Sequence, residues 1–140
     1  MYTGMQQEGE EETDCEEMMI DYMNSVLSQK VFTILEQTKY VNMLEEAAES
    51  LYRKNRERIF VKQYEGLCLR LLELKKFPET EKWCRRLAQQ HGNTLEAYTC
   101  QLKLYFTMGE REKFFQVMQE LKQSDVIIDN ETLELIRTFS

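Results

Sequence analysis

The side chains that could do chemistry in this chain are four cysteines, one histidine and many carboxylates. Cysteine thiolates and imidazoles are the usual ligands of zinc and the usual partners in nucleophilic catalysis. The cysteines Cys15, Cys68, Cys84 and Cys100 form no Cys-x-x-Cys pair, and their spacing fits no zinc site. The last three lie on apolar faces of expected helices, where a free cysteine acts as a small hydrophobic residue. We therefore expect neither a metal site nor a cofactor.

The single histidine, His91, stands beside Gly92 at the end of an expected helix. There it complements the negative end of the helix dipole, and no cysteine accompanies it in a nucleophile motif. The sequence contains no glycine-rich phosphate loop, no serine elbow and no His-x-x-x-His. We predict no catalytic residues and expect that the protein is not an enzyme.

Charge is distributed unevenly along the 140 residues, whose formal net charge is −7. Residues 1–17 hold seven acidic residues and no Lys or Arg, so the remaining 18 acidic residues balance all 18 basic ones. No basic face of the kind that binds nucleic acid is expected. Residues 1–14 have no apolar rhythm and are interpreted as an acidic disordered tail or linker.

Neither export nor membrane insertion is expected from the sequence. The first residues are acidic where a signal peptide would be basic, and no apolar run approaches the about 20 residues of a membrane span. The cysteine pattern suits a reducing compartment. We expect a cytoplasmic protein.

Helical spacing of apolar residues predicts an all-α fold, in keeping with one proline and five glycines. Asp14, Asn93 or Thr94, and Asp129 or Asn130 are the expected N-caps of three of the helices. The expected helices span about 15–28, 31–56, 59–75, 79–90, 94–108, 110–123 and 130–139. We expect one helical domain over 15–140, divided into N-terminal helices (15–57), two repeats (58–123) and a C-terminal link with a capping helix (124–140).

The two repeats emerge when the chain is overlaid on itself with a shift of 34 residues. Tyr64 then matches Tyr98, Leu87 matches Leu121, and apolar residues coincide across two helices per unit. This period resembles the tetratricopeptide repeat. Helical hairpins of this kind cannot bury their apolar faces alone, so the flanking helices are expected to act as caps.

The C-terminal half narrows the resemblance. The order Leu95-Glu96-Ala97-Tyr98, then Gly109-Glu110-Arg111-Glu112, then the run from Asp125 to Leu135 with its Glu131-Thr132 is similar to the bacterial transcriptional activator domain. That is the helical half of regulators of the antibiotic-regulatory-protein type. The resemblance covers about residues 58–139 and implies a last helix that packs back on the bundle. Such regulators also carry a winged-helix DNA-binding domain, for which 140 residues leave no room. The chain is thus either a piece of a longer regulator or a stand-alone relative.

A partner-binding groove is expected along the first helix of each repeat, which lines the concave face of such proteins. An amphipathic helix or extended peptide would suit this surface. The alternative is that the N-terminal helices fill it. Some repeat domains bind the terminal carboxylate of a chaperone with a Lys and an Asn on the first helix. This chain has Glu65 and Leu69 at those places, so we expect no such clamp. The ten candidates are Lys62, Glu65, Leu69, Leu72, Glu73, Glu96, Thr99, Lys103, Phe106 and Thr107.

Two functions follow as hypotheses. The first is a protein–protein interaction domain of a bacterial transcription regulator that acts by dimerisation or by binding another protein. The second is a stand-alone repeat adaptor or chaperone that holds a partner's helix. In both, the partner is a protein or a second copy of the chain, without nucleic acid or membrane.

Overall fold

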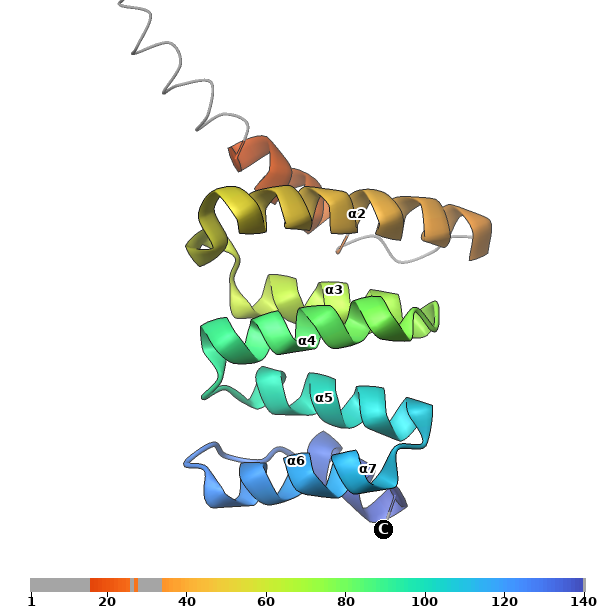
Figure 1. Ribbon diagram of the computed structural model, residues 1–140, viewed down its shortest axis with the longest axis vertical. Helices are drawn as coiled ribbons and strands as arrows, with labels where there is room; N and C mark the ends of the chain where they lie inside the picture. The colour runs from red at the N-terminus through yellow and green to blue at the C-terminus, as the bar shows by residue number, and fades with distance from the viewer. Residues whose placement is uncertain (1–15, 26, 28–33, 140) are drawn as a thin grey trace, which may run out of the picture. The chain divides into compact units, whose positions relative to one another are not determined.

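The protein is all-helical in the computed structural model, which describes residues 16–25, 27 and 34–139 (Figure 1). It divides into two compact units, residues 1–63 and 64–140, and each is described by itself. No strand occurs in the described ranges. None of the helices there is long and apolar enough to cross a membrane.

The first unit contains a helix over residues 16–25, the long helix α2 (Ile34–Asn55), the short η1 (Arg56–Arg58) and the first turn of α3 (Val61–Glu73). Arg58 pairs with Glu16 at 2.7 Å, and the Gln63 amide donates to Asn24 Oδ1 at 3.2 Å. These two contacts join the ends of the unit to each other. The predicted helices agree with the structure where it is described, whereas the predicted cap Asp14 lies outside the described residues. The core of this unit comprises Met23, Val41, Leu44, Ala48, Leu51 and Ile59.

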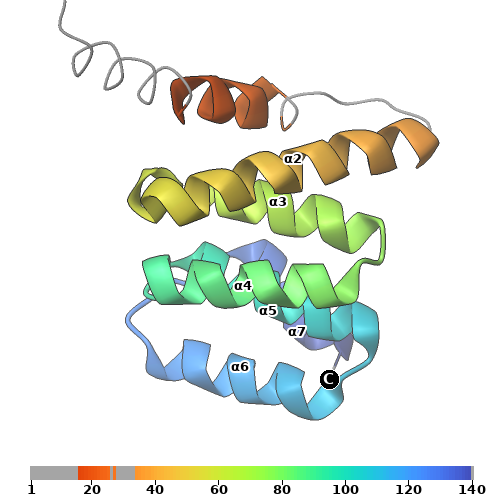
Figure 2. The same ribbon diagram turned by 45° about the horizontal axis from the view of Figure 1, so that its top comes forward.

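The second unit continues α3 and adds α4 (Phe77–His91), α5 (Leu95–Met108), α6 (Arg111–Gln123) and α7 (Asn130–Phe139). In Figures 1 and 2, α3 and α4 form one antiparallel hairpin and α5 and α6 another. The predicted limits agree within about two residues, and α4 begins at Phe77 where the predicted helix began at 79. Pro78 therefore occupies the first turn of α4, where its missing N–H removes no intrahelical bond.

The turns of the two hairpins share one geometry, at positions 34 residues apart. Lys75 has φ 58° and Gly109 has φ 73°, so both adopt the left-handed conformation. The next residue donates its N–H five positions back in each case, from Lys76 to Leu71 O at 3.0 Å and from Glu110 to Tyr105 O at 2.9 Å. This is the Schellman pattern of helix termination, which favours glycine.

Side-chain caps fix two other helix ends at predicted positions. Thr94 caps α5, because its Oγ1 accepts from the Ala97 N–H at 3.3 Å. Asp129 caps α7, because its Oδ1 accepts from the Thr132 N–H at 2.9 Å. Gly92 does end α4 as predicted, but with an ordinary right-handed φ of −63°.

The core of the second unit surrounds α5, which packs against α4, α6 and α7. Trp83 and Tyr64 are fully buried, with ring centroids 6.2 Å apart between α3 and α4. Phe114 of α6 is the largest buried side chain at the other end. The cluster there contains Leu102, Phe114, Val117, Leu121 and Ile136, with Tyr98, Tyr105, Phe106, Phe115, Met118, Val126, Ile128, Leu135 and Phe139 packed against it.

The two turns predict opposite effects of substitution. Lys75→Gly should stabilise the protein by up to about 1 kcal/mol, because a β-carbon is strained at positive φ. Gly109→Ala should destabilise it by about 1 kcal/mol, since no atom obstructs the new Cβ and only the backbone is strained. Urea unfolding followed by circular dichroism measures both free energies of unfolding. Equal effects of the same sign would contradict the shared turn geometry.

Candidate functional site

The ten predicted groove residues lie on α3 and α5. Among them Lys62, Glu73 and Thr107 are exposed and Thr99 is buried, while the others are half-buried. Lys62 belongs to the first unit and the other nine to the second. The polar groups of Thr99 and Thr107 bond locally, to Glu96 O at 3.3 Å and to Lys103 O at 2.8 Å.

Two of these residues are engaged by the protein's own last helix. Lys103 Nζ lies 3.2 Å from Glu131 Oε1 of α7. The Phe106 ring lies 5.2 Å from the ring of Phe139 at the end of α7 and 6.5 Å from that of Phe114. This end of α5 is therefore covered by α7, and Phe106 is a packing residue as well as a groove candidate.

The surface of α5 and α6 on which α7 packs, called here the seat of α7, is largely aromatic. Phe139 contacts Phe114 edge-to-face at 4.5 Å between centroids and Phe115 at 6.3 Å. The Arg111 guanidinium lies 5.7 Å from the rings of both Phe115 and Phe139, and it donates to Phe139 O at 3.2 Å. At the other end of α7, hydrogen bonds from the Thr132 side chain and backbone lower the pKa of Asp129. Ring packing and a charged cap thus hold α7 in place.

On α3, the candidates in the second unit present two half-buried leucines between carboxylates. Leu69 and Leu72 are flanked by the half-buried Glu65 and the exposed Glu73. A half-exposed apolar pair with charged neighbours is suited to contact with another apolar surface. These residues remain candidates for partner binding.

Three buried thiols lie together in the core, and their proximity was not among the predictions from the sequence. Cys68 of α3, Cys84 of α4 and Cys100 of α5 are free and almost fully buried. Hydrogen bonds between the Cys68 thiol and those of Cys100 and Cys84, together with burial, raise the pKa of Cys68 well above its ordinary value. Their regular spacing of 16 residues was the available signal, yet only the packing of three helices shows that they converge. No described group of three His, Cys, Asp or Glu side chains is arranged to hold a metal ion.

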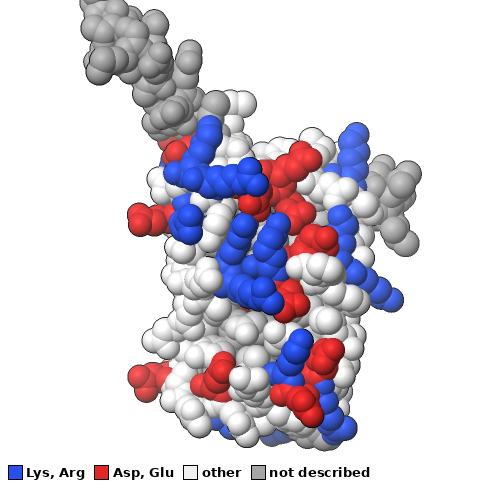
Figure 3. Space-filling view, viewed as in Figure 1, with Lys and Arg blue, Asp and Glu red and all other residues white. Residues whose placement is uncertain are grey.

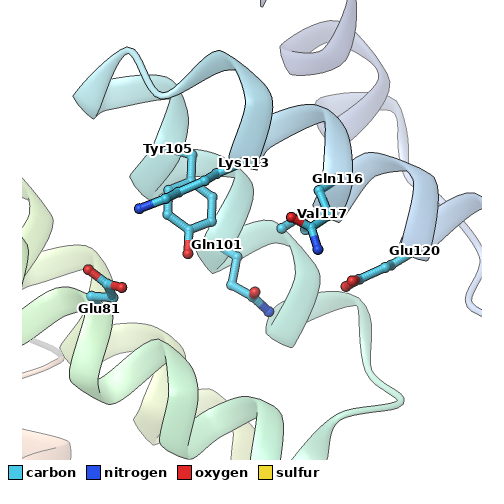
Figure 4. A pocket seen from close by; sticks show the side chains of 7 residues that line it. All are labelled: Glu81, Gln101, Tyr105, Lys113, Gln116, Val117 and Glu120. Atoms are coloured by element: carbon cyan, nitrogen blue, oxygen red, sulfur yellow. The ribbon is translucent and has the colours of Figure 1, made fainter.

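A polar pocket of about 230 Å³ opens between α4, α5 and α6 (Figure 4). None of the ten predicted groove residues lines it, because those residues lie on other faces of α3 and α5. No pattern in the sequence indicates this pocket, since its walls are ordinary polar residues of three helices. They are Glu81 of α4, Gln101 and Tyr105 of α5, and Lys113, Gln116, Val117 and Glu120 of α6.

The two ends of the pocket differ in their electrostatics. At one end, Glu81 is paired with Arg85 at 2.7 Å, and the Lys113 ammonium lies 5.7 Å from the centre of the Tyr105 ring. Burial and the nearby Glu81 carboxylate raise the pKa of Tyr105. At the other end, the Glu120 carboxylate has no ion pair or hydrogen bond within the described part of the chain. Gln101 donates its amide N–H to Ala97 O at 2.9 Å, which leaves its side-chain carbonyl available to accept.

The remaining sequence candidates have structural contacts. His91 is half-buried in the last turn of α4, and its ring meets Tyr64 edge-on at 5.8 Å. Lys and Arg side chains gather over α4 with carboxylates beside them (Figure 3). On α4, the charged groups of Lys82 and Arg86 lie 5.5 and 4.7 Å from the centre of the buried Trp83 ring. They cover a core aromatic side chain, as cation–π pairs commonly do.

Comparison with known proteins gives no relative: no family model, no curated protein and no solved structure matches this chain.

The burial of the three thiols predicts that they react slowly with disulfide reagents in the folded protein. Because thiolate is the reactive form, a buried thiol with a raised pKa should react with a disulfide reagent far more slowly than after unfolding in denaturant. The pKa of Cys68 is higher in the folded than in the unfolded protein, so this thiol also makes stability depend on pH. Its contribution to the free energy of unfolding is complete below about pH 8.5 and is lost as the pH rises beyond that value. Reagent kinetics and urea unfolding at pH 7 and pH 10 measure both effects. The variant Cys68→Ala should lose most of the pH dependence, whereas Cys15→Ala should retain it.

Proposed function

We propose that this chain is a protein–protein interaction domain built on tetratricopeptide-like hairpins, of the type found in bacterial transcriptional activator domains. The observation that supports this proposal most is the repeated hairpin turn. Lys75 and Gly109 share a left-handed backbone and a hydrogen-bond pattern at the 34-residue interval of the sequence repeat. A repeat of this length with helical hairpins is typical of tetratricopeptide proteins, which bind other proteins.

The final helix adds support. The resemblance implies a last helix, opened by Glu-Thr, that packs back on the bundle. Here α7 begins with Asn130-Glu131-Thr132, is capped by Asp129 and packs against α5 and α6. Glu131 pairs with Lys103, and Thr132 is buried, so both residues of the pair contribute contacts.

Function by binding rather than catalysis agrees with the environment of the reactive side chains. The three thiols are buried among helices, and His91 packs against Tyr64. In this proposal the half-buried strip on α3, centred on Leu69 and Leu72, contacts the partner, which is either a regulatory protein or a second copy of the chain. The strip buries apolar surface, and its flanking carboxylates set specificity.

The test is binding by variants of this strip. Glu73→Lys changes an exposed side chain, and Leu69→Asp places a charge among the apolar contacts; each should weaken partner binding by about tenfold, which corresponds to about 1.4 kcal/mol. Self-association is measured by sedimentation, and binding of an identified partner by calorimetry. Ile127→Asp is the matched control, since Ile127 is 87% exposed in the same unit but lies outside the strip.

Substitution of Phe106 is a poor test, because it would disturb the aromatic seat of α7 as well as any partner contact. If both strip variants bind as the control does, and both remain folded by circular dichroism, the α3 strip is not the partner surface.

A further inference from the structure

We infer that the pocket between α4, α5 and α6 receives an arginine side chain from the partner protein. The inference rests on the proposed protein-binding function, and it adds a second contact surface with a defined chemistry. The space of about 230 Å³ is small for a typical cofactor but suits one long side chain.

The acceptors of the pocket are concentrated at one end. The Glu120 carboxylate has no partner within the described part of the chain. The Gln101 side-chain carbonyl is oriented by the hydrogen bond that the amide N–H of the same side chain donates to Ala97 O. The side chain of Gln116, from the same wall as Glu120, likewise makes no hydrogen bond among the described residues. In Figure 4 the ends of these three side chains face the same open space. Carboxylate and carbonyl oxygens that converge in this way are suited to the donors of a guanidinium group.

The other end of the pocket is already neutralised. Glu81 is paired with Arg85, and Lys113 lies by the Tyr105 ring. An incoming cation therefore gains most at Glu120, and its aliphatic stem can lie against Val117 and the Tyr105 ring, which line the pocket. Arginine suits this arrangement better than lysine, because its planar group contacts several acceptors at once and packs on aromatic faces.

The charges that line the pocket do not favour an anionic ligand. Lys113 is the one cation among the residues that line the pocket, and two carboxylates line it as well. Arg85 offsets Glu81, so the carboxylate that remains unpaired is Glu120, at the end of the pocket away from Lys113. An acidic side chain placed there would be repelled.

The experiment uses the full chain with N-acetyl-arginine amide as the probe, observed by ¹⁵N NMR. We expect saturable shifts in the side-chain amide signals of Gln101 and Gln116. Glu120→Gln should weaken binding by about fivefold, which corresponds to about 1 kcal/mol for one charge contact. Glu112→Gln removes an exposed carboxylate of the same helix outside the pocket, so it should leave the affinity unchanged.

Several results would overturn the inference. These are equal or tighter binding of the blocked glutamate probe, an unchanged affinity in Glu120→Gln, and no shift up to the solubility limit of the arginine probe. Binding of free arginine or a polyamine that exceeds that of the blocked probe would identify a small-molecule site instead. The proposed function is tested separately, because partner binding that depends on Leu69 would survive failure of the arginine probe.

Discussion

Burial of α5 is the constraint on which the second unit depends. A helical hairpin leaves one apolar face uncovered, and here α5 is the helix against which α4, α6 and α7 all pack. Small side chains at Ala97 and Cys100 allow neighbouring helices to approach α5 closely. The Cys100 thiol is hydrogen-bonded to that of Cys68 on α3. Leu102 and Leu104 fill the remaining space without exposure. Because α5 is shared, the two hairpins form one core instead of two.

The small number of repeats explains why the second unit needs α7. Two hairpins leave an open end at α6, where Phe114 would lose its cover without another element. Phe139 and Ile136 of α7 supply this cover, while exposed Glu131, Glu134 and Arg137 form its polar outer face. A capping element with one apolar and one polar face is a general requirement of repeat proteins. The covered Phe106 is a consequence, so the available partner surface is expected on α3 more than on α5.

The sequence predicted the helices and two caps well because their signals are local. Thr94 and Asp129 form bonds with backbone groups three residues away, and Gly109 marks a left-handed turn by its type. Lys75 adopts the same turn without a glycine, so no local signal revealed it. The thiol cluster and the polar pocket depend on which helices become neighbours. Those contacts join residues distant in the chain, and periodicity alone does not specify them.

The geometry of α5 separates the pocket from the contacts that α5 makes with α7. Successive residues turn by about 100° around a helix, so Gln101 and Tyr105 share one side of α5. Lys103, Phe106 and Thr107 fall on the opposite side by the same rule. The first pair lines the pocket, and Lys103 and Phe106 meet α7. A change on one side therefore leaves the other in place, provided that the buried residues between them are kept.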